Sequence, residues 1–393
     1  MAKIDDSVKK KVPELRFKGF TDDWEERKLG DEVRIVMGQS PNSENYTDDP
    51  NDYILVQGNA DMKNGRVFPR VWTTQITKQA KKDDLILSVR APVGDIGKTA
   101  YDVVIGRGVA AIKGNEFIFQ NLGKMKSDGY WTRYSTGSTF ESINSTDIKE
   151  AIISIPAIEE QNKIGSFFKQ LDNTIALHQR KLDLLKEQKK GYLQKMFPKN
   201  GAKVPELRFA GFADDWEERK LEDIFLYKQG QQVPVENQFT KPGKHRHRFI
   251  RIVDLTTTDE EPRYIEYSGH NTISATDLFM IRYGQPGVIG YGYEGVIANN
   301  LFKLIPKVKA NNRFFKYRLD SMYPKIQSLS SSTTMPAISF KSLDVLDVRY
   351  PDIKEQEKIG AFFKQLDDTI ALHQRKLDLL KEQKKGFLQK MFV

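Results

Sequence analysis

The sequence predicts an α+β fold in which two globular, mixed α/β domains alternate with two long helices. Three features of the 393-residue chain lead to this fold class. Two segments occur twice, in the same order, so the chain is built as two copies of one plan. The segment that closes each copy has apolar residues at helical spacing. The regions inside the copies are broken by Gly, Pro, Asn and Asp, and they contain short apolar runs that are typical of strands.

A short segment opens each copy, and we call it the box. The first box, residues 12–31, reads VPELRFKGFTDDWEERKLGD, and the second box, residues 204–223, reads VPELRFAGFADDWEERKLED. A variable region and then a helical segment follow each box. The predicted parts are the first box with its variable region (1–156), the first helix (157–200), the second box with its variable region (201–351) and the second helix (352–393).

The helical segments are almost identical in the two copies. Residues 172–191 read DNTIALHQRKLDLLKEQKKG, and residues 367–386 read DDTIALHQRKLDLLKEQKKG. Pro156 and Pro351 precede the two helices, and Pro198 stops the first one. Apolar residues recur at alternating steps of four and three, which is the heptad seam of a coiled coil. The predicted seam consists of Ile164, Phe168, Leu171, Ile175, His178, Leu182 and Leu185 in the first helix and of Ile359, Phe363, Leu366, Ile370, His373, Leu377 and Leu380 in the second.

A narrow apolar seam needs a partner helix. The other copy is the obvious partner, and because a domain separates the two helices we expect an antiparallel coiled coil with pseudo-twofold symmetry. His178 and His373 would occupy equivalent seam positions, and we interpret them as polar residues that set the register rather than as catalytic or metal-binding groups. The same symmetry places the first box beside the end of the second helix, so that the chain closes like a ring.

The variable regions are expected to share one fold but to present different surfaces. The apolar runs at 53–56, 85–89, 248–253 and 278–281 indicate short strands between loops. Few letters agree between the regions, whereas the helices and boxes are nearly fixed. A faint common skeleton of identical residues remains at equivalent positions. Asp84 and Leu85 correspond to Asp277 and Leu278. Gly94, Ile96, Gly97, Thr139 and Ile143 correspond to Gly287, Ile289, Gly290, Thr334 and Ile338.

Two glycine motifs resemble nucleotide-binding loops. Residues 97–99 read Gly-Lys-Thr, as at the end of a phosphate loop, and residues 290–295 contain the pattern G-x-G-x-x-G. In a nucleotide site a helix should follow the glycines, but no clear helix follows either motif. Gly97 and Gly290 are equivalent in the two copies, and we interpret both as parts of one β-turn.

The sequence offers no arrangement of residues that predicts catalysis. His245 and His247 lie in KHRHRF, which fits a basic loop better than a metal site. Asp352 with residues 382–384 hints at a nuclease metal site, but the first copy has Ala157 in place of Asp352. The chain has no cysteine, which excludes thiolate chemistry and Cys-based zinc sites. We therefore expect neither a metal site nor a catalytic site in this chain.

The charge of the chain indicates an anionic partner. The formal net charge is +9 and the pI is about 9.2, and nucleic acid is the commonest partner of such a basic protein. A basic but inert surface is the alternative. No apolar run approaches the length of a membrane span, and the N-terminus has no apolar stretch of the signal-peptide kind. A cytoplasmic location fits the absence of cysteine.

Polar and basic side chains of the variable regions are the candidates for DNA contacts. Arg and Gln read guanine and adenine bidentately in the major groove, and Ser, Thr and Lys more often contact phosphates. For any one of these residues an ordinary solvated surface is the alternative. The candidates are Gln39, Ser40, Arg66, Arg70, Arg90, Lys98, Ser135, Thr136, Ser138 and Thr139 in the first region, and Gln231, Lys244, Arg246, Arg248, Arg251, Arg263, Arg282, Tyr291, Tyr293, Ser331 and Thr333 in the second.

The two-copy plan resembles the specificity (S) subunit of Type I restriction–modification systems. Each variable region ends in a Ser/Thr-rich stretch and a Pro, and EEQNKIGSFF or KEQEKIGAFF then opens the helix. The resemblance covers essentially the whole chain. It implies that each variable region is a target recognition domain that reads one half of a bipartite DNA site. Because the two regions differ, it also implies an asymmetric target.

The resemblance further implies partners and cofactors. The helices are expected to set the spacing of the half-sites and to dock two modification (M) subunits, which restriction (R) subunits then join. A helix over residues 164–197 spans about 50 Å, or roughly 15 base pairs of B-DNA. The S subunit is expected to be non-catalytic, with S-adenosylmethionine, ATP and Mg in the partner subunits. A coiled-coil scaffold with two ligand-binding modules that do not act on DNA is the alternative.

Overall fold

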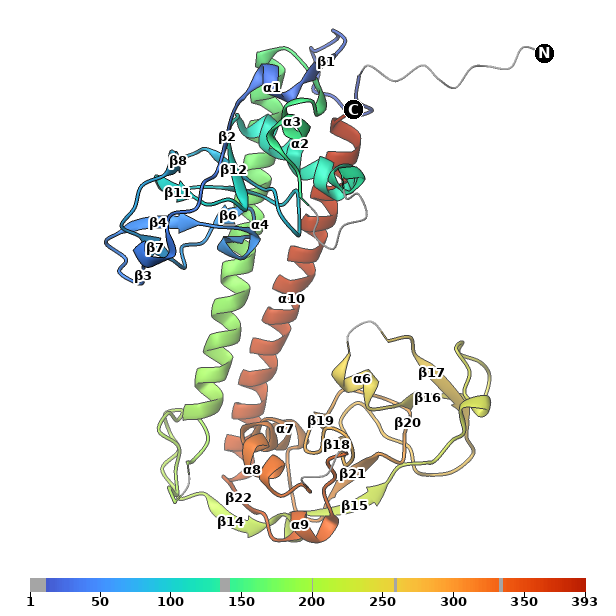
Figure 1. Ribbon diagram of the computed structural model, residues 1–393. Helices are drawn as coiled ribbons and strands as arrows, with labels where there is room; N and C mark the ends of the chain where they lie inside the picture. Colours follow the sequence, from blue (N-terminus) through green and yellow to red (C-terminus); the bar gives the residue numbers. More distant parts are fainter. Residues whose placement is uncertain (1–11, 135–141, 200, 258–259, 332–334) are drawn as a thin grey trace, which may run out of the picture. The chain divides into compact units, whose positions relative to one another are not determined.

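The chain divides into two compact units. The computed structural model describes residues 12–134, 142–199, 201–257, 260–331 and 335–393 (Figure 1). Unit 1 contains the described residues up to Arg180 together with Gln374–Val393, and unit 2 contains Lys181–His373. The long helices α4 (Ile158–Lys195) and α10 (Ile353–Met391) therefore contribute to both units. Among the described residues, every helix is too short or too polar to cross a lipid bilayer.

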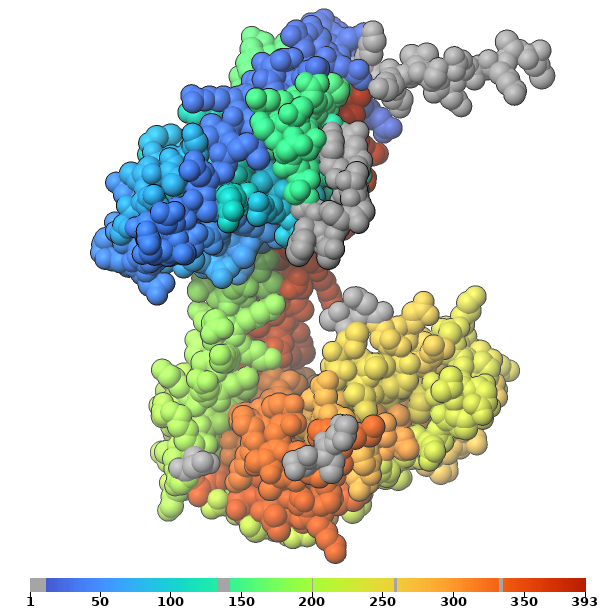
Figure 2. Space-filling view, in the orientation of Figure 1, coloured from blue at the N-terminus to red at the C-terminus, as the bar shows by residue number. Residues whose placement is uncertain are grey.

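The variable region of unit 1 contains two sheets, and with the first box it forms one continuous surface, blue to teal in Figure 2. The larger sheet has the order β2 (Arg34–Met37), β12 (Val109–Lys113), β9 (Leu85–Ser88), β10 (Ile96–Lys98), β6 (Arg66–Val67) and β5 (Met62–Lys63). The smaller sheet has the order β3 (Tyr46–Thr47), β7 (Trp72–Thr73), β4 (Tyr53–Val56), β11 (Val103–Ile105) and β8 (Lys78–Ala80). The remaining elements are β1 (Glu25–Lys28), which pairs with β13 (Ile152–Ile155), and the helices α1 (Leu29–Glu32), α2 (Glu116–Ser127) and α3 (Ser145–Lys149), with 3-10 turns at Ser43–Asn45, Asn59–Asp61 and Tyr130–Tyr134.

Unit 2 repeats this plan with shorter sheets. One sheet has the order β15 (Phe225–Gln229), β21 (Leu301–Pro306), β18 (Leu278–Ile281) and β19 (Ile289–Gly290), and the other has the order β17 (Arg263–Glu266), β16 (Arg246–Ile250) and β20 (Val296–Ile297). The remaining elements are β14 (Glu217–Lys220), which pairs with β22 (Asp347–Tyr350), and the helices α5 (Leu221–Ile224), α6 (Val253–Thr256), α7 (Asn312–Ser321), α8 (Tyr323–Ser328) and α9 (Phe340–Asp344), with a 3-10 turn at Val235–Asn237.

The two variable regions share one topology, as the faint skeleton predicted. The order β2-β12-β9-β10 in unit 1 corresponds to β15-β21-β18-β19 in unit 2. Both units also contain one parallel pair inside the smaller sheet, β4 with β11 in unit 1 and β16 with β20 in unit 2. Most other strand pairs are antiparallel. The predicted α+β fold class is therefore confirmed.

Two local predictions were wrong. Gly97 and Gly290 lie in strands β10 and β19 rather than in a turn. The turn lies just before them, at Gly94 and Gly287, whose φ angles of 84° and 93° favour glycine. The run 248–253 is only partly a strand, because β16 ends at Ile250 and α6 begins three residues later. The strands expected at 53–56, 85–89 and 278–281 are present.

Aromatic side chains join the box, the variable region and both long helices within each unit. In unit 1, Phe392 at the end of α10 packs against Trp24 of the box, Phe117 of α2 and Phe168 of α4, with ring centroids 6.2, 5.0 and 5.8 Å away. Such contacts contribute about 0.5–1.5 kcal/mol each beyond the area that they bury. The beginning of α4 therefore lies beside the end of α10 in this unit.

The same cluster recurs in unit 2 with the two helices exchanged. Phe197, just after α4, packs against Trp216 of the second box, Phe314 of α7 and Phe363 of α10, at 6.2, 5.8 and 5.8 Å. Here the end of α4 lies beside the beginning of α10. The helices are therefore paired antiparallel in each unit.

Lysine and aspartate side chains pair the helices at equivalent positions of the repeat. Lys384 Nζ of α10 lies 2.6 Å from Asp172 Oδ1 of α4 in unit 1, and Lys189 Nζ of α4 lies 2.6 Å from Asp367 Oδ1 of α10 in unit 2. The structure places the predicted seam residues as follows: Ile164, Phe168, Leu182, Leu185, Ile359, Phe363 and Leu377 are buried, and Leu171, Ile175, His178, Leu366, Ile370, His373 and Leu380 are half-buried.

Each box is fixed to the end of one long helix and to the beginning of the other. The Leu15 N–H donates to the carbonyl oxygen of Lys390 at 2.8 Å, and the Leu207 N–H donates to that of Lys195 at 2.9 Å. The first box therefore lies beside the end of the second helix, as the predicted ring closure requires.

The box arginines bind the first turns of the long helices. Arg16 donates from Nε and Nη2 to the two carboxylate oxygens of Glu160, both at 2.7 Å. Arg208 forms the same pair with Glu355 at 2.8 Å. The carboxylates are almost completely buried, with 1% and 0% of their side chains exposed. These hydrogen bonds raise the pKa of both guanidinium groups above the usual value.

Glycines in the long helices lead to a stability prediction. Nothing lies within 4 Å of a Cβ built at Gly191 or Gly386. Because glycine is unfavourable inside a helix, the double change Gly191→Ala and Gly386→Ala should raise the free energy of unfolding by about 1–2 kcal/mol. Urea denaturation of the full chain measures this.

A third helical glycine supplies the control for this prediction. A Cβ on Gly165 of α4 would lie 2.9 Å from Glu116 Cβ and 3.1 Å from the Phe117 nitrogen. Gly165→Ala should therefore lower the midpoint of unfolding. A destabilised double variant at positions 191 and 386 would contradict the prediction.

Candidate nucleic-acid interface

Four loops meet at one edge of the larger sheet in unit 1, and we call this surface the first edge. It consists of residues 38–40, 89–90, 106–108 and 142–143. These loops adjoin because strands β2, β12 and β9 are neighbours and all have an end here. Backbone hydrogen bonds join them: Gly38 N–H to Val109 O (3.0 Å), Gln39 N–H to Ile105 O (2.8 Å), Val89 N–H to Gly108 O (2.9 Å) and Ile143 N–H to Val89 O (3.0 Å).

The first edge carries exposed polar side chains. Gln39, Arg90 and Arg107 are exposed, and Ser40 is half-buried. The Arg107 N–H donates to Ser40 Oγ at 3.1 Å, which fixes the two loops to each other. Within the described part of the chain, the guanidinium groups of Arg90 and Arg107 have no ion pair or hydrogen bond. Two cations are thus available to an external anion or base.

Unit 2 has the corresponding second edge, which consists of residues 230–232, 282–283, 298–300 and 337–338. Its hydrogen bonds repeat those of the first edge: Gly230 N–H to Leu301 O (2.9 Å), Gln231 N–H to Ile297 O (2.8 Å), Arg282 N–H to Asn300 O (2.8 Å) and Ile338 N–H to Arg282 O (3.0 Å). The backbone hydrogen bonds are thus the same in both units, and Gln39 and Gln231 are equivalent, but Arg90 and Arg107 correspond to Tyr283 and Asn299.

A cavity of about 580 Å³ opens beside the second edge. Gln232, Asn299 and Asn300 of the edge line it, together with Arg251 and Phe249. Carboxamide side chains such as those of Gln232, Asn299 and Asn300 can hydrogen-bond the edge of a base. This cavity therefore places three carboxamide residues at the second edge.

The predicted DNA-binding residues divide into those at the edges and those elsewhere. Gln39, Ser40 and Arg90 lie on the first edge, and Gln231 and Arg282 lie on the second. Ser331 adjoins the second edge, since its N–H donates to the carbonyl oxygen of Ala337 at 2.9 Å. Ser135, Thr136, Ser138, Thr139 and Thr333 lie outside the described residues.

Three candidates in unit 1 lie away from the first edge. Arg66 Nη2 reaches Asn173 Oδ1 of α4 at 3.5 Å, and Arg70 Nη1 donates to the carbonyl oxygen of Ala60 at 3.0 Å. Lys98 Nζ lies 2.5 Å from Glu116 Oε2, which neutralises its charge.

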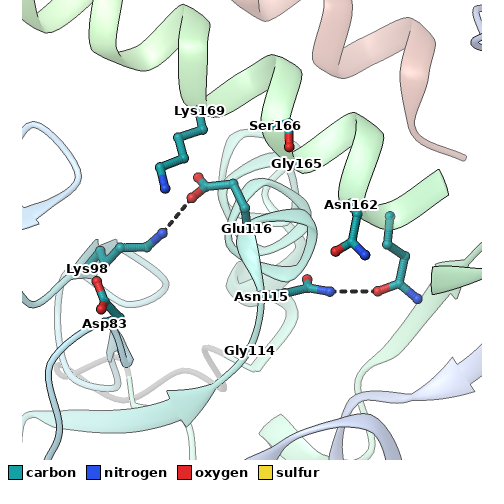
Figure 3. Close-up of a pocket in the computed structure, with 10 residues that line it drawn as sticks. Asp83, Lys98, Gly114, Asn115, Glu116, Asn162, Gly165, Ser166 and Lys169 are labelled. Carbon is teal, nitrogen blue, oxygen red and sulfur yellow. Dashed lines mark hydrogen bonds and ion pairs between the residues drawn. The ribbon is translucent and has the colours of Figure 1, made fainter. Parts of the chain in front are cut away.

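Lys98 lines a polar cavity of about 340 Å³ between α2 and α4 (Figure 3). The Asn115 side chain there donates from Nδ2 to Gln161 Oε1 at 2.9 Å and also caps the start of α2. In unit 2 the Asn311 N–H donates to Gln356 Oε1 at 3.0 Å at the same place. These contacts attach each variable region to its long helix, so we assign them a positioning role.

Several arginines of unit 2 are held by intramolecular partners. Arg248 and Arg251 both pair with Asp254, whose side chain is 1% exposed. The Tyr293 hydroxyl donates to the carbonyl oxygen of Asp254 at 2.9 Å, and burial raises the pKa of this tyrosine. Arg282 donates to Gln229 Oε1 at 3.1 Å and to the carbonyl oxygen of Ile338 at 3.2 Å. Of these contacts, the one between Arg282 and Ile338 joins two loops of the second edge.

The remaining candidates of unit 2 lie on or next to strands. Arg246 of β16 lies over the Phe239 ring at 3.5 Å, and Arg263 lies on β17. Lys244 precedes β16, and Tyr291 follows β19. None of these four belongs to the four loops of the second edge.

Arg107, Tyr283, Asn299 and Asn300 belong to the edges but were not among the predicted site residues. Arg107 stands between two glycines in IGRGV, which is a turn signal that could have drawn attention to it. Its equivalence to Asn299 could be recognised only from the matching hydrogen bonds. In the described part of the chain, no cluster of His, Cys, Asp or Glu is arranged to hold a metal ion.

Comparison with protein families gives a match in both copies. A family model described as Type I restriction modification DNA specificity domain matches residues 21–187 and 213–382. A putative type I restriction enzyme MjaX specificity subunit of Methanocaldococcus jannaschii is 32% identical over 177 residues, which are 43% of this chain and 41% of that protein. This match thus spans less than half the length of the MjaX subunit. The MjaVIII specificity subunit of the same organism is 19% identical over 399 residues, which are 93% of this chain and 91% of that protein.

Solved structures show the same fold. A Type I restriction–modification system S subunit from M. genitalium gives a TM-score of 0.69 at 17% identity, and the match covers 97% of this chain and 99% of that one. A structure described in terms of complex assembly and conformational transition of the type I R-M system gives a TM-score of 0.53 at 18% identity and covers 94% and 97% of the two chains.

Proposed function

The chain belongs to the family of Type I restriction–modification DNA specificity domains, and on this premise we propose that each copy reads one half of an asymmetric, bipartite DNA site. One observation carries the proposal. The first and second edges have the same backbone hydrogen bonds and the same glutamine (Gln39 and Gln231), but Arg90 and Arg107 in one unit correspond to Tyr283 and Asn299 in the other. One scaffold with two sets of base-reading side chains suits a site whose halves differ in sequence.

The long helices and boxes are assigned to spacing and to partner binding. They are nearly identical in the two copies, and they form the same aromatic clusters and ion pairs in both units. Two identical M subunits would need two equivalent docking surfaces, which these segments provide. Methylation with S-adenosylmethionine, and ATP- and Mg-dependent cleavage, are assigned to the M and R subunits. We assign no catalytic step to this chain.

Methylation mapping of a chimaera tests the proposal. Wild-type chain, co-expressed with its M subunit in a methylation-free host, should produce N6-methyladenine in one asymmetric bipartite motif. In the chimaera, residues 224–345 replace residues 32–150, so both copies carry the second variable region. Its motif should consist of two inverted copies of one wild-type half-site.

Controls separate folding from specificity in this experiment. The M subunit without this chain should methylate no bipartite motif, and this chain without the M subunit should methylate nothing. A chimaera that assembles with the M subunit and still methylates the wild-type motif would show that the variable regions do not read the DNA.

A further inference from the structure

At each edge, one turn connects equivalent strands of the two units, but the side chains of the turn differ between the units. In unit 1 the turn between β11 and β12 reads Gly106-Arg107-Gly108, and in unit 2 the turn between β20 and β21 reads Ala298-Asn299-Asn300. The flanking hydrogen bonds correspond, since the turn accepts from Val89 N–H in unit 1 and from Arg282 N–H in unit 2. Arg107 and Asn299 are therefore equivalent.

The turn of unit 1 is held rigidly by close backbone approaches. The Gly106 N–H donates to the carbonyl oxygen of Val56 at 2.8 Å. A Cβ at Gly108 would lie 2.0 Å from the carbonyl oxygen of Gln57, and a Cβ at Gly38 would lie 2.1 Å from that of Gly106. No side chain fits at these glycines, so the backbone under Arg107 has little freedom.

The guanidinium of Arg107, like that of Arg90 on the same edge, differs from cations elsewhere in unit 1. Arg70 lies 4.0 Å from Asp61, and Lys98 is paired with Glu116, whereas Arg107 is exposed and pairs with no carboxylate among the described residues. The guanidinium of an arginine carries five N–H donors in a planar fork, and this geometry matches O6 and N7 of guanine.

In unit 2 the backbone of the turn is fixed by Gln229 and Arg282. Gln229 Nε2 donates to the carbonyl oxygen of Asn299, and the Arg282 N–H donates to that of Asn300 at 2.8 Å. Asn299 and Asn300 both line the cavity of about 580 Å³, and within the described residues their side-chain amides bond to no other group. Each carboxamide offers one donor and one acceptor, which matches N7 and N6 of adenine.

We propose that this turn is the principal base-reading element of each copy: Arg107 reads a guanine in the first half-site, and Asn299 with Asn300 reads an adenine in the second. The inference rests on the proposed function and adds which residues read which base. An arginine that held only a phosphate would contribute affinity without base preference.

The test uses the complete methyltransferase, assembled from this chain and its M subunits, on duplexes in which each base pair of both half-sites is replaced in turn. With Arg107→Ala, discrimination at one G·C pair of the first half-site should fall by about 5- to 150-fold. Discrimination throughout the second half-site should stay at the wild-type level, which also shows that the assembly is folded. The double variant Asn299→Ala, Asn300→Ala should lower discrimination at one A·T pair of the second half-site. Its discrimination throughout the first half-site should stay at the wild-type level.

Two further variants sharpen the test. Arg70→Ala removes an exposed arginine of the same variable region, which lies near Asp61 and away from the first edge, and should leave every base preference unchanged. Arg107→Lys keeps the charge and donors that can reach guanine but loses the planar fork, so its discrimination at the G·C pair should fall between those of wild type and Arg107→Ala.

Two results would overturn the inference. If Arg107→Ala weakened methylation equally on all duplexes, Arg107 would be a phosphate contact, and the inference alone would fall. If wild-type enzyme methylated no bipartite motif, the proposed function and the inference would fall together.

Discussion

Replacement of Arg16 by alanine is expected to lower the free energy of unfolding of unit 1 by about 3–5 kcal/mol. In the wild-type chain the Arg16 guanidinium donates to both oxygens of the Glu160 carboxylate at 2.7 Å. The Glu160 side chain is only 1% exposed, so the change leaves a buried carboxylate without a partner. An uncompensated buried charge costs far more than an exposed ion pair contributes. Arg208→Ala should have an equivalent effect in unit 2, where Glu355 is 0% exposed.

Urea denaturation of the full chain, followed by circular dichroism, measures this effect. Arg27→Ala is the matched control, because Arg27 belongs to the same box and pairs with Glu25 at the surface. Adding Glu160→Gln to Arg16→Ala should recover part of the loss, since the buried group is then neutral. An Arg16→Ala chain as stable as the Arg27→Ala chain would show that water, or protonation of Glu160, replaces the arginine.

Addition of one base pair between the two half-sites is expected to reduce specific methylation by about 10³-fold or more. The extra base pair shifts one half-site by about 3.4 Å along the axis and rotates it by roughly 35°. A single chain whose helices set the spacing would then contact only one half-site. The helices α4 and α10 contain 38 and 39 residues, or about 57 Å each.

Competition binding and methylation assays on duplexes with spacers of different length measure this prediction. Duplexes with a changed spacer sequence of constant length serve as controls and should be methylated like the original. Equal methylation with spacers that differ by one base pair would exclude the spacing role of the helices.

The repeat predicted the helices well because a seam is visible in a single sequence. The steps of four and three place Phe168 and Phe363 in apolar positions, and both are buried in the aromatic clusters. Lys189 and Lys384 lie three residues before the final leucine-or-aromatic turns of the helical segments, and their partners could not be predicted from the sequence. Their partners come from the other helix, so they are identified only when the antiparallel register is known.

The candidate site could be predicted only in part, because composition shows a charge but not its counter-ion. Arg248 and Arg251 look as available in the sequence as Arg107 does. The short helix α6 brings Asp254 against Arg248 and Arg251. No carboxylate of the described residues pairs with Arg107. The first edge itself is formed by loops far apart in the chain, so that its members could not be grouped before the sheet order was known.

The near-identity of the two helices has a consequence for how the chain selects its fold. Asp172 and Lys189 lie on the same helix, and each binds the equivalent of the other on α10. Two α4 helices from separate molecules would form the same ion pairs, so the helix faces do not distinguish a partner within the chain from one in another molecule. The covalent connection makes that distinction, because it keeps α10 at a high effective concentration near α4. Dilution during folding therefore favours the closed monomer, and crowding of unfolded chains favours exchange of helices between molecules.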